Sequence, residues 1–263
     1  MTLEKGSLIL VDYTAKVKDS NEIFETTREE EAKKSDLFDP TRKYEPRLIS
    51  IGEGWVLRGL DETLATANIG DKFDVEITPD KGFGERDPNK VRMVAQRKLG
   101  EKADEVRVGD VIEIDNRTGI VRYVGSGRVQ VDFNHRFAGR TLKYDVDIVK
   151  KLESDDDKIR SLIKRRLPLE DEKIKINLNG FTLEIELPEE TLLAEGLQII
   201  KRAAANDVFK FVPSLKDIKF IESFKSSSSS LPQDQQENDQ STNVEQQTDL
   251  KSEEKERKTD RNK

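Results

Sequence analysis

Strict alternation of apolar and polar residues is the feature that most restricts the fold of this chain. In "LILVDYTAKV" the apolar side chains fall on one side of an extended segment, at Ile9, Val11, Tyr13, Ala15 and Val17. "KFDVEI" (72–77) and "TLKYDVDIV" (141–149) repeat the pattern. A two-residue period is that of a strand with one buried face. The sequence therefore predicts several half-buried strands.

The stretch "IGEGWVLRGLDETL" (51–64) places the only tryptophan between glycines. Its apolar residues recur at helical spacing, at Val56, Leu57, Leu60 and Leu64, and Gly70 is a plausible helix stop. We expect either a helix that buries its first turn or the floor of a pocket.

Residues 88–132 form a separate block of short β patterns. "VRVGDVIEI", "GIVRYV" and "GRVQVDF" are separated by Gly-Asp, Asn-Arg-Thr-Gly and Gly-Ser-Gly turns. The valines and isoleucines are candidates for the core or exposed face of this block: Val106, Val108, Ile112, Ile114, Val121, Val124, Val129 and Val131. The block predicts a small β domain.

The pattern changes after the acidic run "ESDDD" (153–157). A helix, a hairpin around Asn179-Gly180, an amphipathic helix with acidic residues in its first turn, and a strand follow, so 154–225 predicts an αββαβ domain. Residues 226–263 are polar and nearly free of aliphatic side chains, and we expect them to be disordered. The fold class is α+β.

Composition excludes several functions. The chain has no cysteine and one histidine, His135, which excludes disulfides, Cys/His zinc sites and cysteine nucleophiles. The net charge of −7 makes nucleic acid an unlikely main ligand, although the basic "KRRL" (164–167) leaves an RNA or ribosome module open. We expect no membrane segment and no signal peptide, and hence a cytoplasmic protein.

The sequence contains no acid–base apparatus. His135 lies beside aromatic residues and is expected to be structural, and "GEGWVLRG" lacks the ending of a phosphate loop. Rotation about a prolyl peptide bond, whose barrier of about 18–20 kcal/mol comes from amide resonance, is one reaction that needs an apolar site and no proton transfer, but composition alone does not select it.

Four stretches in order resemble the FKBP-type peptidyl-prolyl cis/trans isomerases, specifically the SlyD-like, long archaeal type. They are "VDYTAKV…IFETT", "IGEGWVLRGLDETL", "PDKGFGERDP" and "FNHRFAGRTLKYDVDIV". The resemblance implies an antiparallel sheet wrapped over a short helix, formed by 1–87 and 133–153. It implies that 88–132 is a chaperone module inserted in the flap, and that 154–225 is the extra C-terminal domain.

The resemblance also implies a substrate pocket. The residues carried over as catalytic are Tyr13, Phe24, Glu25, Val56, Leu57, Leu60, Phe83 and Tyr144. Ile49, Trp55 and Phe137 are expected to bind substrate, with Trp55 partly exposed at the pocket mouth. Without the resemblance, the pattern favours core positions on strands for the tyrosines, and helix-packing positions for Val56, Leu57 and Leu60.

Three positions depart from the family pattern. Glu25 stands where an aspartate is usual, Phe83 lacks the hydroxyl of the usual flap tyrosine, and Leu60 replaces a floor tryptophan. The histidine-rich metal-binding tail of bacterial SlyD is missing, so we expect no metal and no cofactor.

The implied function is a prolyl isomerase with holdase activity on unfolded or proline-containing clients. The alternative is a binding protein whose isomerase pocket has drifted. The C-terminal domain is expected to support homodimerisation or client binding.

Overall fold

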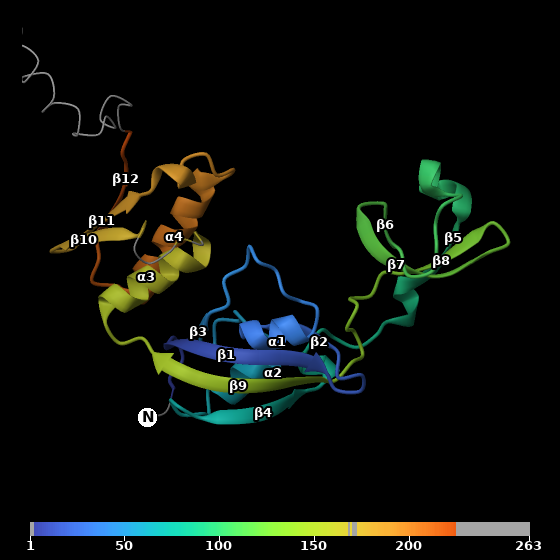
Figure 1. The fold of residues 1–263 in the computed structure, drawn as a ribbon, viewed down its shortest axis with the longest axis horizontal. Coiled ribbons are helices and arrows are strands. Elements are labelled where there is room, and N and C mark those ends of the chain that lie inside the picture. Colours follow the sequence, from blue (N-terminus) through green and yellow to red (C-terminus); the bar gives the residue numbers. More distant parts are fainter. Residues whose placement is uncertain (1–2, 168, 170–172, 225–263) are drawn as a thin grey trace, which may run out of the picture.

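The predicted strands assemble into three sheets, each with its own strand order. A computed structural model describes residues 3–167, 169 and 173–224. Figure 1 shows the inserted sheet, in green, and the C-terminal domain, in yellow to red, at opposite ends of the first sheet. The α+β fold class is confirmed. The predicted disordered tail, 226–263, lies outside the described residues.

The first sheet has the order β2-β1-β9-β4, with β3 paired to the other end of β1. Its strands are β1 Leu8–Val17, β2 Ile23–Thr26, β3 Arg47–Ser50, β4 Lys72–Ile77 and β9 Leu142–Lys151, and every pair is antiparallel. Its helical elements are α1 Glu29–Lys34, α2 Arg58–Leu64 and the 3₁₀ turn η1 Pro79–Lys81. The alternating apolar side chains of β1 are all buried, as predicted.

Helix α2 packs on the inner face of this sheet. Leu60 and Leu64 join the core formed by β1 and β9. A Cβ built on Gly59 would lie 2.8 Å from Cγ2 of Ile77, so only glycine allows α2 to approach β4 this closely. The helix is shorter than its apolar spacing indicates, because Leu57 is extended, with ψ of 143°, and precedes the first turn.

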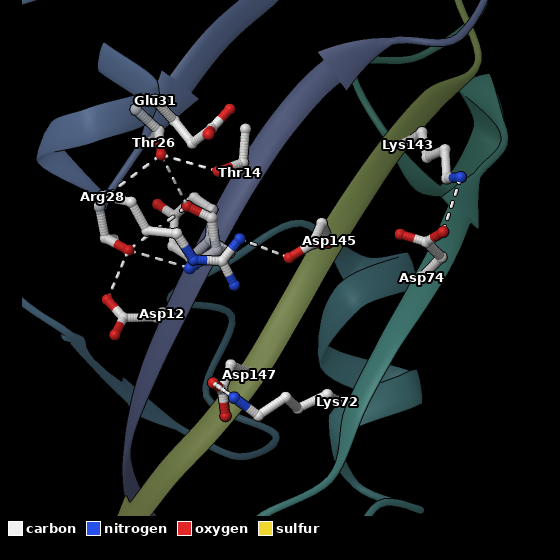
Figure 2. A network of polar contacts seen from close by, with 12 residues as sticks. Asp12, Thr14, Thr26, Arg28, Glu31, Lys72, Asp74, Lys143, Asp145 and Asp147 are labelled. Carbon is white, nitrogen blue, oxygen red and sulfur yellow. Dashed lines mark hydrogen bonds and ion pairs between the residues drawn. The ribbon is translucent and has the colours of Figure 1, made fainter. Parts of the chain in front are cut away.

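The outer face of the sheet is polar. Figure 2 shows ion pairs between Lys72 and Asp147 and between Lys143 and Asp74, which join β4 to β9. Exposed pairs of this kind contribute roughly 0.2–1 kcal/mol each. The free energy of burial therefore comes from the inner face, which also carries the candidate site.

The inserted domain is a four-stranded antiparallel sheet of order β5-β8-β7-β6. It comprises η2 Pro88–Lys90, β5 Val91–Ala95, η3 Gln96–Lys102, β6 Val111–Ile114, β7 Arg117–Gly125 and β8 Arg128–Asp132. Val121, Val129 and Val131 are buried, whereas Val108 is 64% exposed. The remaining predicted core residues pack partly against the buried three: Val106, Ile112, Ile114 and Val124.

Two hydrogen bonds join the two chain segments that connect the insert to the first sheet. The Asp87 N–H donates to Oδ1 of Asn134, and Nδ2 of Asn134 donates to the Asp87 carbonyl, both at 2.9 Å. The start and the end of the insert therefore lie side by side.

The C-terminal domain has the predicted αββαβ order. Its elements are α3 Asp155–Arg166, β10 Lys175–Asn179, β11 Thr182–Leu187, η5 Glu189–Thr191, α4 Leu197–Phe211 and β12 Asp217–Glu222. Asn179 pairs with Thr182, and Gly180 has φ of 61°, which completes the predicted hairpin. The expectation of acidic residues in the first turn of α4 is wrong, because Gly196 in the left-handed region separates η5 from the helix.

The C-terminal domain packs against the first sheet through a shared apolar cluster. Leu8, Leu48 and Leu152 of the sheet domain join Ile159 and Leu162 of α3 in this cluster. In the part of the chain that the structure describes, no helix is long and apolar enough to cross a bilayer.

Candidate active site

Five of the predicted residues form one group of aromatic rings, called here the aromatic cluster: Tyr13, Phe24, Phe83, Phe137 and Tyr144. The Phe24 ring centroid lies 4.5 Å from that of Phe137 and 6.3 Å from those of Phe83 and Tyr144. Tyr13 and Tyr144 lie 5.7 Å apart. These separations are typical of interacting aromatic pairs. Residues from β1, β2, the loop after η1, the segment between β8 and β9, and β9 itself thus converge on one apolar site.

A polar triad borders the aromatic cluster. The Tyr13 hydroxyl donates to Oε1 of Glu25 at 2.8 Å, and Nη1 of Arg47 donates to both, at 2.7 Å and 2.6 Å. The pairing of β1 with β2 and with β3 brings these residues together. The longer Glu25 side chain therefore has a fixed position, held by two donors.

Burial is the main reason that the pKa of Tyr13 rises from 10 to about 12, and the nearby Glu25 carboxylate adds to it. Burial likewise raises the pKa of Tyr144. The folded state therefore favours both neutral phenols, and this contribution to stability is complete below pH 10, where an unfolded tyrosine is also neutral.

We expect the Tyr13→Phe variant to lose less stability than the wild type between pH 10 and pH 12. Tyr13 accounts for up to roughly 2.7 kcal/mol of that loss, since its pKa differs by about two pH units between the two states. Urea unfolding followed by Trp55 fluorescence measures it. Tyr123→Phe, at an exposed tyrosine of the insert, is the matched control. Equal alkaline losses in the Tyr13→Phe variant and the wild type would contradict this assignment.

The segment before α2 supplies the predicted edge and floor. Leu60 and Ile49 are buried, and Val56 and Leu57 are half-buried against the same core. Among the described residues, none accepts a hydrogen bond from the Leu57 N–H. That N–H is therefore available to donate a hydrogen bond to a ligand.

His135 lies against Phe83 of the loop after η1. Its ring stacks on Phe83 with centroids 4.1 Å apart, and its Nδ1 accepts a hydrogen bond from the Phe137 N–H at 3.3 Å. Partial burial and the neighbouring Arg136 lower its pKa. These contacts agree with the structural role that the sequence indicates, and they add His135 to the rim of the aromatic cluster.

Trp55 lies in a different environment from the other candidates. Its ring meets Phe211 of α4 edge-on at 5.6 Å, and the Arg165 guanidinium of α3 stacks 3.7 Å above it. The ring is half-buried at the contact between the first sheet and the C-terminal domain. The structure therefore does not bring Trp55 to the aromatic cluster.

Sequence reasoning missed Arg47, which is the cationic member of the triad. The signal was weak, because one arginine at the start of a strand in a chain with 46 lysines and arginines resembles ordinary surface charge. Among residues 3–167, 169 and 173–224, no three or more histidines, aspartates or glutamates are grouped to hold a metal ion.

Comparison with known proteins gives three family matches along the chain. Residues 1–99 match the FKBP-type peptidyl-prolyl cis-trans isomerase family, residues 106–137 the FKBP26 IF domain, and residues 155–225 the FKBP26 C-terminal domain. Together they span most of the chain in the order seen in the structure.

Individual relatives match about half of the chain. A short-type peptidyl-prolyl cis-trans isomerase of Methanocaldococcus jannaschii is 29% identical over 146 residues, which are 56% of this chain and 92% of the relative. An FKBP-type 16 kDa isomerase of Escherichia coli is 25% identical over 56% of this chain and 93% of its own. SlyD of Aeromonas hydrophila is 36% identical over 43% of this chain and 54% of its own.

Three family matches in series, the relatives and an aromatic site on an antiparallel sheet agree with one another. The chain belongs to the FKBP-type peptidyl-prolyl cis-trans isomerases, with an inserted IF domain and a C-terminal domain of the FKBP26 type.

Proposed function

We propose that the protein accelerates cis/trans isomerisation of X-Pro bonds in unfolded clients and holds those clients on its inserted domain. The observation that carries the proposal is the aromatic cluster, in which the five rings named from the family motifs lie in contact with one another. Uncatalysed rotation takes tens of seconds or longer because amide resonance opposes it.

The chemistry requires binding rather than proton transfer. A site that fits the twisted amide better than the planar amide lowers the rotation barrier by that difference in binding free energy. The aromatic cluster and Leu60 supply an apolar surface for the proline ring, and the Leu57 N–H can donate to the carbonyl of the substrate. Glu25, held by Tyr13 and Arg47, presents a fixed carboxylate beside the rotating bond.

Exposed apolar side chains support a client-holding role for the insert. Met93 on β5 and Tyr123 on β7 both lie opposite Gln130 of β8, on the outer face of its sheet, and are about half exposed. Val108 and Val111 are 64% and 69% exposed. Such side chains suit contact with the apolar residues of an unfolded chain.

A protease-coupled assay with short proline peptides tests the isomerase proposal. We expect acceleration proportional to protein concentration. Binding of the peptide without acceleration would instead favour the alternative, a chaperone whose isomerase pocket has drifted.

Two further parts of the proposal are a cytoplasmic location and a homodimer formed through the C-terminal domain. The absence of cysteine agrees with a reducing compartment. Exposed Leu193, Ile199 and Phe181 of the C-terminal domain agree with a partner surface. Light scattering on the full chain and on a truncation after residue 153 tests the dimer, and a monomeric full chain would contradict it.

A further inference from the structure

A groove of about 900 Å³ is lined by residues of the first sheet domain on one side and of helix α3 on the other. It is called here the basic groove. One wall is formed by most of the segment 42–48, with Leu10 of β1 and Lys150 and Leu152 at the end of β9. The other is formed by side chains of α3 between Asp157 and Arg166. Figure 1 shows the segment between α1 and β3 projecting from the sheet on the same side as the C-terminal domain. The volume lies at the upper end of the range of about 300–1,000 Å³ for ligand sites.

The groove is strongly cationic although the chain carries a net charge of −7. Eight of its lining residues are cations: Arg42, Lys43, Arg47, Lys150, Arg160, Lys164, Arg165 and Arg166. Three are carboxylates, Glu25, Glu45 and Asp157. Among the residues that the structure describes, Asp156 and Asp207 pair with groove arginines from outside the lining, so the eight lining cations face five described carboxylates.

The excess positive charge is held in place by the fold. Arg165 is fixed between Asp207 and the face of Trp55. Its burial lowers its pKa, and so do the neighbouring Arg166 and Arg47 on the opposite wall. Cations from two domains therefore repel each other across the groove, and a bound anion would relieve this repulsion.

The basic groove is continuous with the candidate active site. Glu25 and Arg47 line the groove, and both also belong to the triad that holds the Tyr13 hydroxyl. A polypeptide whose proline lies on the aromatic cluster can therefore extend into the groove.

We propose that the basic groove binds acidic residues of the client polypeptide that flank the proline in the aromatic cluster. The inference rests on the proposed isomerase function and names a preferred substrate class for it, proline segments with neighbouring aspartates or glutamates.

The lining favours polypeptide over nucleic acid. Leu10, Pro46, Leu48 and Leu152 give the groove an apolar floor, which suits the side chains and backbone of a peptide. None of its lining residues is aromatic, whereas binding of single-stranded nucleic acid relies on base stacking.

The test compares two short proline peptides, one with three glutamates beside the proline and one with glutamines at the same positions. For the full chain at low salt, we expect kcat/KM about tenfold higher for the acidic peptide. The preference should fall to about twofold at 0.5 M NaCl, where charges are screened. Glutamates placed before or after the proline in separate peptides identify the direction of the chain in the groove.

Two single-charge variants are matched. Arg42→Gln removes an exposed groove cation whose contacts are the Thr26 carbonyl and the Tyr44 ring. Arg202→Gln removes an exposed cation of α4 outside the groove lining. We expect Arg42→Gln to lower the acidic-to-neutral ratio of kcat/KM about threefold, and Arg202→Gln to leave it unchanged.

Peptide binding can be measured separately from turnover through the fluorescence of Trp55, because the Arg165 guanidinium lies over its ring. An acidic peptide whose carboxylates bind Arg165 should change the fluorescence emission of Trp55, with a Kd that depends on salt. The glutamine peptide should change this emission less. A single-stranded polyuridine oligonucleotide is the competing probe.

The outcomes separate the two claims. Equal turnover of both peptides by the wild type overturns the groove inference and leaves the isomerase intact. Turnover of neither peptide overturns the proposed function and the inference together. Tighter binding of polyuridine than of the acidic peptide, weakened by Arg42→Gln, would make nucleic acid the occupant and overturn a polypeptide ligand.

Discussion

A variant in which a short Gly-Ser linker replaces residues 88–132 should catalyse proline-limited refolding of a protein roughly 100-fold more slowly than the wild type. Its kcat/KM for short proline peptides should change less than about threefold. The difference follows because the insert raises the local concentration of client at the active site, an effect of about 10²–10⁴ for tethered binding. A short peptide gains nothing from that surface.

The deletion can be closed with little strain because Asp87 and Asn134 lie in direct hydrogen-bond contact at the base of the insert. A second variant keeps the insert folded and replaces its exposed apolar residues by serine: Met93, Val108, Val111 and Tyr123. Both variants should slow refolding catalysis. Equal losses on peptide and protein substrates would contradict a division of labour between the insert and the pocket.

Replacing Phe24 by alanine should lower kcat/KM for a neutral proline peptide by roughly 30-fold to 100-fold. The Phe24 ring contacts three other rings of the aromatic cluster, so its loss removes apolar surface from the position of the substrate. Burial of a phenylalanine side chain contributes about 1.5–3 kcal/mol, which is roughly 13-fold to 160-fold in rate and brackets the expected loss.

Phe38→Ala is the matched control, since Phe38 is a 41% exposed phenylalanine of the same domain outside the aromatic cluster. It should leave peptide turnover unchanged. Near-ultraviolet circular dichroism establishes that both variants are folded. A folded Phe24→Ala variant with full activity would show that the aromatic cluster is not the site of catalysis.

Much of the first sheet follows from short-range pattern. The alternating residues of β1 and β9 are buried as their two-residue period predicts, and those of β4 are half-buried or buried. The aromatic residues named from the family motifs converge because strand register fixes which face each occupies. Tyr13 and Tyr144, for example, lie on neighbouring strands and on the same face.

Features that depend on distant partners could not be predicted in this way. The residues around Trp55 carry no signal of its partners Phe211 and Arg165, which lie more than a hundred residues further along the chain. Arg47 joins the triad only through the pairing of β3 with β1. The parallel pairing of β11 with β12 likewise has no local signal.

Local breaks account for the remaining differences. The left-handed Gly196 delays α4 until Leu197, although the preceding leucines continue an amphipathic pattern. Strand β5, Val91–Ala95, was not predicted because its alternation is short and two of its side chains are exposed.

Two-dimensional exchange NMR on a short neutral proline peptide, with a catalytic amount of the full chain, tests the central claim most directly. It reports cis/trans exchange without a coupling protease. The account predicts exchange faster than the uncatalysed rate of once in tens of seconds, at a rate that is flat between pH 7 and pH 9 because no proton is transferred. Peptide binding with exchange at the uncatalysed rate would contradict it.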